Sequence, residues 1–263
     1  MNFLEVMNEF VEKQLIKIGF SFIFCNVCGS IRKIKIKTNN LREDATCKKC
    51  SSNSRKRHLA EEILELVNKQ NKTSYNSLRK IKKDSGLKIY NVESNGALHH
   101  YLKHINNYVC SEYFGPYETY GNEQNGILNV DLMNIPLDDN TFDLIVSTEV
   151  FEHIPDPYKA FSEVHRILNK GSHVFTVPYY EDKENDEVRA FLDDNNEIVH
   201  LMKQEYHGDP IRSDEGILVY TVFAKEMQKK LKAMGFEVKV SKKRSIIEGI
   251  LGDNNIVFTT TKL

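Results

Sequence analysis

The sequence predicts an α/β protein built on a mostly parallel sheet with helices on both faces, preceded by a small cysteine-bearing module. Two observations predict this fold. From Lys88 onward, short apolar runs alternate with amphipathic helical patterns, which is typical of strand–helix–strand units. Before that point, four of the five cysteines fall into two closely spaced pairs. We therefore expect two domains, residues 1–84 and residues 85–263.

The length and the N-terminus fit a cytoplasmic enzyme or binding protein. A chain of 263 residues suits one large domain with a small appendage. The opening "MNFLEVMNEFVEKQL" contains acidic residues and no cleavage site, so it predicts an amphipathic helix rather than a signal peptide. No apolar run approaches the roughly 20 residues needed to cross a bilayer. We expect a cytoplasmic protein with reduced cysteines.

Charge is distributed unevenly along the chain. Residues 1–88 hold 19 Lys and Arg against 9 Asp and Glu, and the remainder holds 17 against 28. The basic part includes "IRKIKIK", "SRKRH" and "LRKIKK". Each run alone is typical of a solvated face, but together they favour an anionic partner, either a nucleotide-linked or phosphorylated small molecule or a nucleic acid.

The paired cysteines predict a structural zinc site. Cys25 and Cys28 form one CxxC pair, Cys47 and Cys50 form another, and 18 residues separate the pairs. Each pair can present two thiolates from a tight turn, and two pairs complete a tetrahedron around Zn²⁺. The intervening "IRKIKIKTNNL" alternates like the strands of a ribbon hairpin. With all four positions filled by thiolates, no open coordination position is left for catalysis. Disulfides or free thiols are the alternative.

The larger part of the chain shows seven apolar runs and three helical patterns. The predicted strands are "KIYNV", "YVCSE", "GILNVD", "FDLIVST", "HVFTVP", "FEVKV" and "NIVFTTT". The predicted helices are "GALHHYLKHI", "PDPYKAFSEVHRILN" and "VFAKEMQKKLKAMG". Ligands of parallel sheets bind beyond the carboxyl ends of the strands, so the residues that follow each strand are the candidates for a binding site.

The order of these motifs resembles the class I S-adenosylmethionine-dependent methyltransferases. The strongest part is "NVDLMNIPLDDNTFDLIVSTEVFEHIPDPYKAFSEVHRILNKGSHVFTVP". The cysteine pairs together with "EYHGDP" and "GILVYTVFAKEMQKKLKAMGFE" are similar to a zinc-ribbon-bearing branch associated with bacterial surface-polysaccharide or secondary-metabolite genes. The resemblance implies a Rossmann-like class I methyltransferase sheet after the ribbon, with S-adenosylmethionine as the cofactor.

The resemblance also implies the cofactor-binding residues. Glu112, after the second strand, would accept the ribose hydroxyls, and a solvated strand-end acid is the alternative. Asp131 would accept the adenine amino group and the Leu132 N–H would serve a ring nitrogen, whereas an Asx turn is the alternative for Asp131. Thr148 and Glu149, which end the fourth strand, complete this set.

The loop after the first strand departs from the family pattern. Where the family has three alternate glycines, this chain has Asn91, Glu93, Asn95 and then alanine, with Gly96 between the last two. The cofactor carries no phosphates, so the loop needs only a tight turn and a close backbone approach. We expect Asn and Gly96 to supply permissive backbone positions, and Glu93 or Asn95 to meet the methionine ammonium group.

Two histidines are candidates for a catalytic base. Methyl transfer to a hydroxyl requires alignment of the acceptor and removal of a proton. His153 follows the fourth strand in "FEHIP", and its alternative is a structural role at the start of the helix. His207 lies in "YHGDP", and its alternative is a surface loop. Glu152 would orient His153, contact the substrate or form an ordinary ion pair.

A charged, weakly periodic stretch of about residues 179–219 is predicted to be an insertion that covers the substrate. It offers Tyr179, Tyr180 and Arg189 as substrate contacts. Arg189 would pair with a phosphate or carboxylate of the acceptor, and an exposed surface charge is the alternative.

Three functions compete at this stage. The first is O-methylation of a sugar, a nucleotide-linked glycan or a phosphoryl-type group in capsule or surface-polysaccharide biosynthesis. The second is RNA methylation with the zinc ribbon as the nucleic-acid-binding module. The third is a non-catalytic zinc-ribbon protein whose cofactor site has degenerated. We expect no membrane span, and the sequence does not give the oligomeric state.

Overall fold

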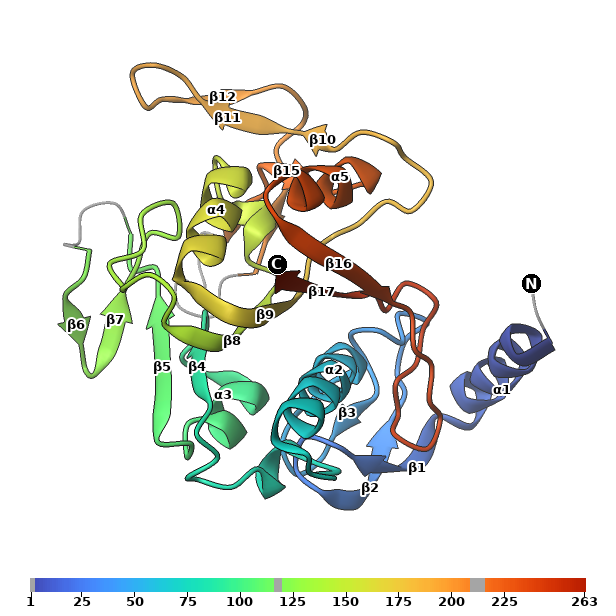
Figure 1. Ribbon diagram of the computed structural model, residues 1–263. Helices are drawn as coiled ribbons and strands as arrows, with labels where there is room; N and C mark the ends of the chain where they lie inside the picture. The colour runs from blue at the N-terminus through green and yellow to red at the C-terminus, as the bar shows by residue number, and fades with distance from the viewer. Residues whose placement is uncertain (1–2, 116–119, 209–215) are drawn as a thin grey trace. The chain divides into compact units, whose positions relative to one another are not determined.

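The computed structural model describes residues 3–115, 120–208 and 216–263 (Figure 1). Contacts between residues divide the chain into two units. The first contains Met1–Lys88, Glu93–Val109 and Val240–Thr259, and the second contains Ile89–Val92, Cys110–Lys239 and Thr260–Leu263. The predicted boundary between residues 84 and 85 stays a prediction.

The first unit begins with a helix and a small antiparallel sheet. The helix α1 spans Phe3–Ile18, which agrees with the predicted amphipathic helix. Strand β1 (Phe20–Cys25) pairs with β2 (Ser30–Lys35), and β2 pairs with β3 (Thr46–Cys47). The predicted hairpin is therefore part of a three-stranded ribbon that includes a strand before the first cysteine pair. Cys25 and Cys47 end β1 and β3, and Cys28 and Cys50 lie in the turns that follow these strands.

Helix α2 (Ser54–Asn71) follows directly from the second cysteine pair. Asn53 caps its N-terminus by accepting a hydrogen bond from the Lys56 N–H at 2.9 Å. Its C-terminus ends at Lys72 in the left-handed region, with φ of 52°. The 3-10 helix η1 (Leu78–Lys80) and helix α3 (Gly96–Leu102) complete the helical part of this unit.

A fully buried arginine joins three loops of the first unit. Arg57 is 0% exposed and donates to the backbone oxygens of Ser52 (2.6 Å), Ala45 (2.9 Å) and Gly249 (2.7 Å). These bonds connect α2 to both sides of the cysteine loop and to the segment near the C-terminus. The positive charge also lies close enough to the four cysteines to be attracted by their thiolates.

Replacing Arg57 by methionine is expected to destabilise the protein by about 3–5 kcal/mol, because three buried carbonyl oxygens lose their donor together. Chemical denaturation of the purified variant measures this change. Arg79→Met is the matched control, because Arg79 is exposed. Equal midpoints for the two variants would show that the Arg57 bonds contribute little.

The large sheet has eight strands in the order β16-β17-β9-β8-β4-β5-β7-β6. Parallel pairing is seen between β4 and β8, between β8 and β9, and between β5 and β7, whereas β6 is antiparallel to β7. The strand bounds are Lys88–Asn91 (β4), Asn107–Glu112 (β5), Glu123–Gln124 (β6), Ile127–Asn129 (β7), Phe142–Thr148 (β8), Leu168–Thr176 (β9), Phe236–Ser241 (β16) and Val257–Lys262 (β17). The predicted α/β sheet is confirmed.

Strand order reverses between β4 and β8. From β4 the chain moves through β5 and β7 toward one edge, and from β8 it moves through β9 toward the other. Such a reversal is the topological switch point at which open α/β sheets bind ligands. The central strand β8 is apolar along most of its length and almost wholly buried, as expected for a strand inside a parallel sheet.

Helices of the second unit follow the predicted positions with shorter ends. Helix α4 spans Pro157–Ile167, with Pro157 at its first position and Asp156 as its cap. Strand β9 begins directly at Leu168, five residues before the predicted start, because its first residues continue the pairing with β8. Helix α5 spans Lys225–Ala233.

The predicted substrate-covering insertion contains more regular structure than expected. Between residues 187 and 222 it forms short antiparallel pairs, namely β10 (Glu187–Val188) with β15 (Thr221–Val222), β11 (Ala190–Leu192) with β12 (Ile198–His200), and β13 (Tyr206–His207) with β14 (Ile217–Leu218). These strands are too short for periodicity to reveal them. Residues 209–215 of the insertion, which include part of "YHGDP", lie outside the described residues.

In the described ranges, no helix combines the length and the apolar character required to cross a bilayer.

Candidate active site

The carboxyl ends of β4 and β8 carry three of the predicted residues to the switch point. Asn91 ends β4 and is fully buried, and Thr148 ends β8 and is 8% exposed. Glu149 follows with φ of 54°, a left-handed backbone that is uncommon for glutamate. The Thr148 Oγ1 atom is buried and makes no hydrogen bond within the described residues. A buried polar atom without a partner, at the edge of the sheet where ligands bind, is suited to a hydrogen bond with a bound cofactor.

The loop after β4 contains a single left-handed residue. Gly96 has φ of +80°, whereas Asn95 is extended with φ of −138° and caps α3 without a side-chain hydrogen bond. The expectation that an asparagine supplies a permissive backbone position is wrong for Asn95, because the glycine alone takes the turn. Glu93 is paired with Lys56, whose Nζ lies 3.9 Å from Glu93 Oε1.

The remaining predicted cofactor residues follow β5 and β7. Glu112 is the last residue of β5 and is half-buried. Asp131 follows β7, and its Oδ1 accepts a hydrogen bond from the Met133 N–H at 2.8 Å. The Asx turn considered as the alternative for Asp131 is therefore present, although one carboxylate oxygen can serve this turn while the other meets a ligand. Leu132 is 7% exposed.

Glu112→Ala and Asp131→Ala are each expected to weaken cofactor binding by about 1–3 kcal/mol, because each leaves a polar group of the ligand without its partner. Calorimetric titration with S-adenosylhomocysteine measures the change. Asp138→Ala serves as the control, because Asp138 is an exposed acid in the segment between β7 and β8. If both variants bind as tightly as the parent protein, the assignment of these two residues is incorrect.

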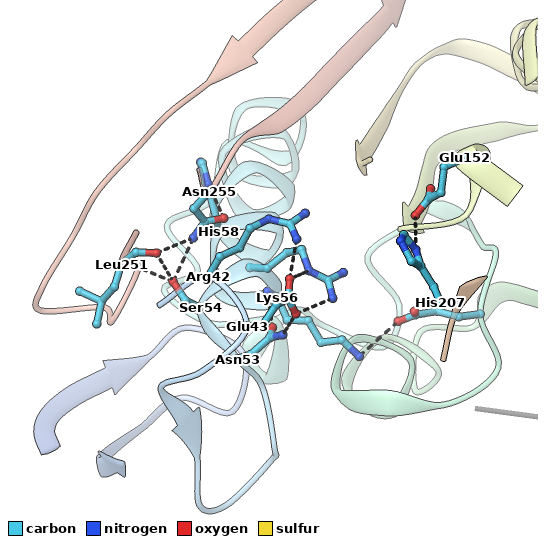
Figure 2. Close-up of polar contacts among 12 residues, drawn as sticks. Arg42, Glu43, Asn53, Ser54, Lys56, His58, Glu152, His207, Leu251 and Asn255 are labelled. Atoms are coloured by element: carbon cyan, nitrogen blue, oxygen red, sulfur yellow. Dashed lines mark hydrogen bonds and ion pairs between the residues drawn. The ribbon is translucent and has the colours of Figure 1, made fainter. Parts of the chain in front are cut away.

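Glu152, His153 and His207 come together in the second unit. Glu152 Oε1 lies 3.5 Å from His153 Nε2 and 3.8 Å from His207 Nδ1, and Figure 2 shows the contact with His207. The two imidazole rings cross edge to face with centroids 5.0 Å apart. The sequence predicted contact of Glu152 with His153 as one alternative, but it did not place His207 beside them. His207 belongs to β13, which pairs with β14 in the insertion.

Aromatic packing fixes the position of this cluster. The 3-10 helix η2 (Phe151–His153) carries Glu152 and His153, and its first residue is fully buried. The Phe151 ring stacks on Phe161 of α4 with centroids 4.1 Å apart. The His153 Nδ1 atom lies 2.9 Å from the Leu218 backbone oxygen. Because a carbonyl oxygen only accepts, Nδ1 carries the hydrogen and Nε2 faces Glu152.

Burial makes Glu152 an unusual carboxyl group. Its side chain is fully buried, and neither oxygen makes a hydrogen bond within the described residues. Burial raises the pKa of Glu152 from 4.5 to about 7, with a further contribution from the Glu149 charge. The Glu152 carboxylate in turn raises the pKa of His207. The pair can hold or release a proton near neutral pH, which is the property required of a general base.

The predicted substrate contacts Tyr179, Tyr180 and Arg189 each have a partner within the second unit. Tyr179 OH accepts a hydrogen bond from Gln228 Nε2 at 2.6 Å, and Lys183 Nζ lies over the Tyr180 ring at 3.8 Å. Arg189 is 16% exposed and pairs with Glu187 at 2.6 Å and with Glu205 at 3.1 Å. These carboxylates compete with any anionic acceptor for Arg189, so a direct phosphate contact there requires one of them to move.

The four predicted zinc ligands form a compact cluster in the first unit. Their sulfur atoms lie within 4.8 Å of one another, with Cys25 and Cys50 at 3.6 Å and Cys28 and Cys47 at 4.0 Å. Tetrahedral coordination with Zn–S bonds near 2.3 Å places sulfurs about 3.8 Å apart. A disulfide requires about 2.05 Å, and none of the five cysteines, all within the described residues, forms one. The geometry therefore fits a four-thiolate metal site.

Sequence reasoning missed Lys56 and Arg57, which lie in the basic run "SRKRH". A basic run usually forms a solvated face. The one sequence signal that could have marked this run as different is its position shortly after Cys50. In the folded chain Arg57 is buried and Lys56 lies against the loop that contains Glu93 and Gly96.

Residues 94–176 match the family model described as a methyltransferase domain. This match begins at the end of the loop after β4, includes the β5 and β7 ends, β8, η2 and α4, and ends with β9. This part of the chain is therefore similar to methyltransferase domains, and together with the switch-point sheet the similarity supports S-adenosylmethionine-dependent methyl transfer.

Individual relatives are distant. A 44-residue stretch is 39% identical to cycloartenol-C-24-methyltransferase 1 of Oryza sativa subsp. japonica, and this match spans 17% of the chain and 13% of that protein. A solved S-adenosylmethionine dependent methyltransferase from Mesorhizobium loti shares 15% identity over 70% of this chain and 95% of its own, with a TM-score of 0.43. A methyltransferase structure from Listeria monocytogenes shares 12% identity over 71% and 96%, with a TM-score of 0.41.

Proposed function

We propose that the protein methylates a hydroxyl oxygen of a small anionic acceptor, using S-adenosylmethionine. The acceptor class is a sugar, a nucleotide-linked glycan or a phosphoryl-type compound of bacterial capsule or surface-polysaccharide biosynthesis, made in the cytoplasm. The observation that supports a hydroxyl acceptor is the buried Glu152 carboxyl group in contact with two imidazoles, because oxygen methylation requires a proton acceptor near neutral pH.

His207 is the better placed of the two candidate bases. Its side chain is 34% exposed, whereas that of His153 is 10% exposed and anchored to Leu218. Glu152 carries the negative charge that stabilises protonated His207. We therefore assign proton removal to the Glu152–His207 pair and a positioning role to His153.

The cofactor, when bound, supplies an electrophilic methyl group on a sulfonium. Thr148 and Asn91 at the switch point, Glu93 on the loop, and Glu112 and Asp131 at the neighbouring strand ends are the residues proposed to hold it. His207 would take the proton of an acceptor hydroxyl whose oxygen receives the methyl group from the sulfonium sulfur. The other product is S-adenosylhomocysteine.

The four-cysteine cluster is proposed to hold a structural zinc ion. The sulfur spacing supports tetrahedral coordination, and Ser52 Oγ lies 3.3 Å from Cys25 Sγ and 3.2 Å from Cys50 Sγ, a contact that would orient both thiolates. Four thiolates and one divalent cation leave a net negative charge, which the buried Arg57 offsets.

An RNA acceptor is the second candidate, and one surface feature favours it. On the ribbon, Phe22 is 65% exposed, Phe20 is 36% exposed and Lys33 Nζ lies 3.8 Å above the Phe20 ring. Exposed aromatic rings between basic side chains can stack bases and pair with phosphates. Strong RNA binding that weakens steeply with salt would favour this candidate.

Methyl transfer from labelled S-adenosylmethionine tests the proposal. Pools of nucleotide sugars, sugar phosphates and total bacterial RNA are offered separately, and the labelled product is identified by mass spectrometry. We expect an O-methylated sugar or sugar phosphate. Label only in RNA would replace the first candidate with the second. Assays with and without added Mg²⁺ separate a base role from use of Glu152, His153 and His207 as ligands of a divalent cation.

A further inference from the structure

Lys56 places a positive charge on the loop that follows β4. Its Nζ lies 3.9 Å from Glu93 Oε1 and 2.8 Å from the position that a Cβ atom would occupy on Gly96. The side chains of Lys56 and Glu93 are 20% and 17% exposed. Within the described residues the ammonium group makes this one loose ion pair and no hydrogen bond, so it has donors available for a ligand.

Hydrogen bonds at the start of α2 position the backbone of Lys56. The Lys56 N–H donates to Asn53 Oδ1 in the first turn of α2, and Asn53 Nδ2 donates to Glu43 Oε2 at 2.8 Å. Arg55 binds both oxygens of Glu43, at 2.7 and 2.9 Å. Figure 2 shows how Glu43, Asn53 and Lys56 meet at the start of the helix. Cys50 lies only three residues before Asn53, so the second cysteine pair sets the position of this turn.

The charges on this loop match the amino-acid end of the cofactor. That end is a zwitterion with an ammonium group and a carboxylate on one carbon atom. Glu93 and Lys56 present the opposite charges side by side, in a partly buried setting where charge-assisted hydrogen bonds are strong.

We propose that Lys56 is a cofactor-binding residue that receives the methionine carboxylate while Glu93 receives the ammonium group. The inference rests on the proposed use of S-adenosylmethionine. Lys56 lies outside the residues 94–176 that match the methyltransferase family. A residue that follows the second cysteine pair would therefore bind the cofactor together with Glu93, which belongs to the same unit.

The left-handed backbone of residue 96, with φ of +80°, favours glycine in this glycine-poor loop. A Cβ atom at residue 96 would also stand 2.8 Å from the Lys56 ammonium nitrogen, so the end of the lysine side chain would have to shift. In this proposal the Lys56 ammonium group replaces the close contacts that further glycines would allow between the loop backbone and the cofactor.

Calorimetric titration of the zinc-loaded protein with three ligands distinguishes the contributions of the carboxylate and the ammonium group to binding. S-adenosylhomocysteine carries both charges, its decarboxylated analogue carries only the ammonium group, and 5′-methylthioadenosine carries neither. Lys56→Gln is expected to weaken S-adenosylhomocysteine binding by about ten- to hundredfold and to leave binding of the other two ligands unchanged. Glu93→Gln is expected to weaken binding of the first two ligands and to spare the third.

Lys56→Arg should restore most of the affinity, and Lys69→Gln, an exposed change in the last turn of the same helix, should have no effect. Metal content and melting temperature of each variant report whether the fold is intact. Equal weakening of all three ligands, or no weakening of S-adenosylhomocysteine, would overturn the inference. Failure of the parent protein to bind S-adenosylhomocysteine would instead overturn the proposed function.

Discussion

Cys47→Ser is expected to abolish stoichiometric zinc binding and to unfold the unit that contains the ribbon. Cys47 is fully buried, and β3, to which it belongs, has only two residues. So small a sheet has little apolar core of its own, and zinc coordination is worth about 10–16 kcal/mol in isolated zinc-finger peptides. Metal analysis and thermal unfolding of the purified variant measure both effects.

Cys110→Ser is the matched control, because this cysteine lies in β5 outside the cluster. It should retain one zinc per chain and most of the thermal stability. A Cys47→Ser protein with full zinc content and an unchanged melting temperature would show that the four cysteines do not form a structural metal site.

His207→Gln is expected to reduce kcat by about 10²–10⁴-fold while S-adenosylhomocysteine binds as before. The substitution removes a general base and keeps a polar side chain of similar size. Single-turnover methyl transfer to the acceptor found in the screen gives the rate. His200→Gln, an exposed histidine of the same insertion, should retain full activity.

The pH profile gives an independent check on the same pair. The pKa of Glu152 is raised from 4.5 to about 7, so the pair holds its proton below neutral pH and releases it above. The rate of the parent protein should rise with pH through about 7 and level off at higher pH. Glu152→Gln should lower the rate and remove this rise, because the buried proton acceptor is gone. A parent profile that is flat between pH 6 and pH 8 would contradict base catalysis by this pair.

The parts of the fold that the sequence predicts well are those with strong local patterns. The apolar run of β8, the helical pattern of α4 and the CxxC spacing each depend on neighbouring residues, and each predicts its feature, although α4 begins at Pro157 rather than at Pro155. The short strands of the insertion carry too few residues for a period to be detected, and they pair through contacts that no local pattern encodes.

In the candidate site, too, local patterns predict individual residues and long-range contacts are not predicted. Contact of Glu152 with His153 was among the alternatives predicted from the sequence, whereas the approach of His207 accompanies a pairing of β13 with β14 that the sequence does not reveal. Lys56 was hidden within a basic run, because a lysine on a solvated face and a lysine against a loop have the same sequence pattern. Long-range packing alone distinguishes them.

The central claim is that a loop with one glycine still binds the cofactor, and calorimetric titration of the zinc-loaded parent protein with S-adenosylmethionine and S-adenosylhomocysteine tests it most directly. We predict micromolar dissociation constants, corresponding to about 8 kcal/mol of binding free energy. Absence of binding at millimolar ligand would contradict the claim and leave the basic, aromatic surface of the ribbon as the functional part of the molecule.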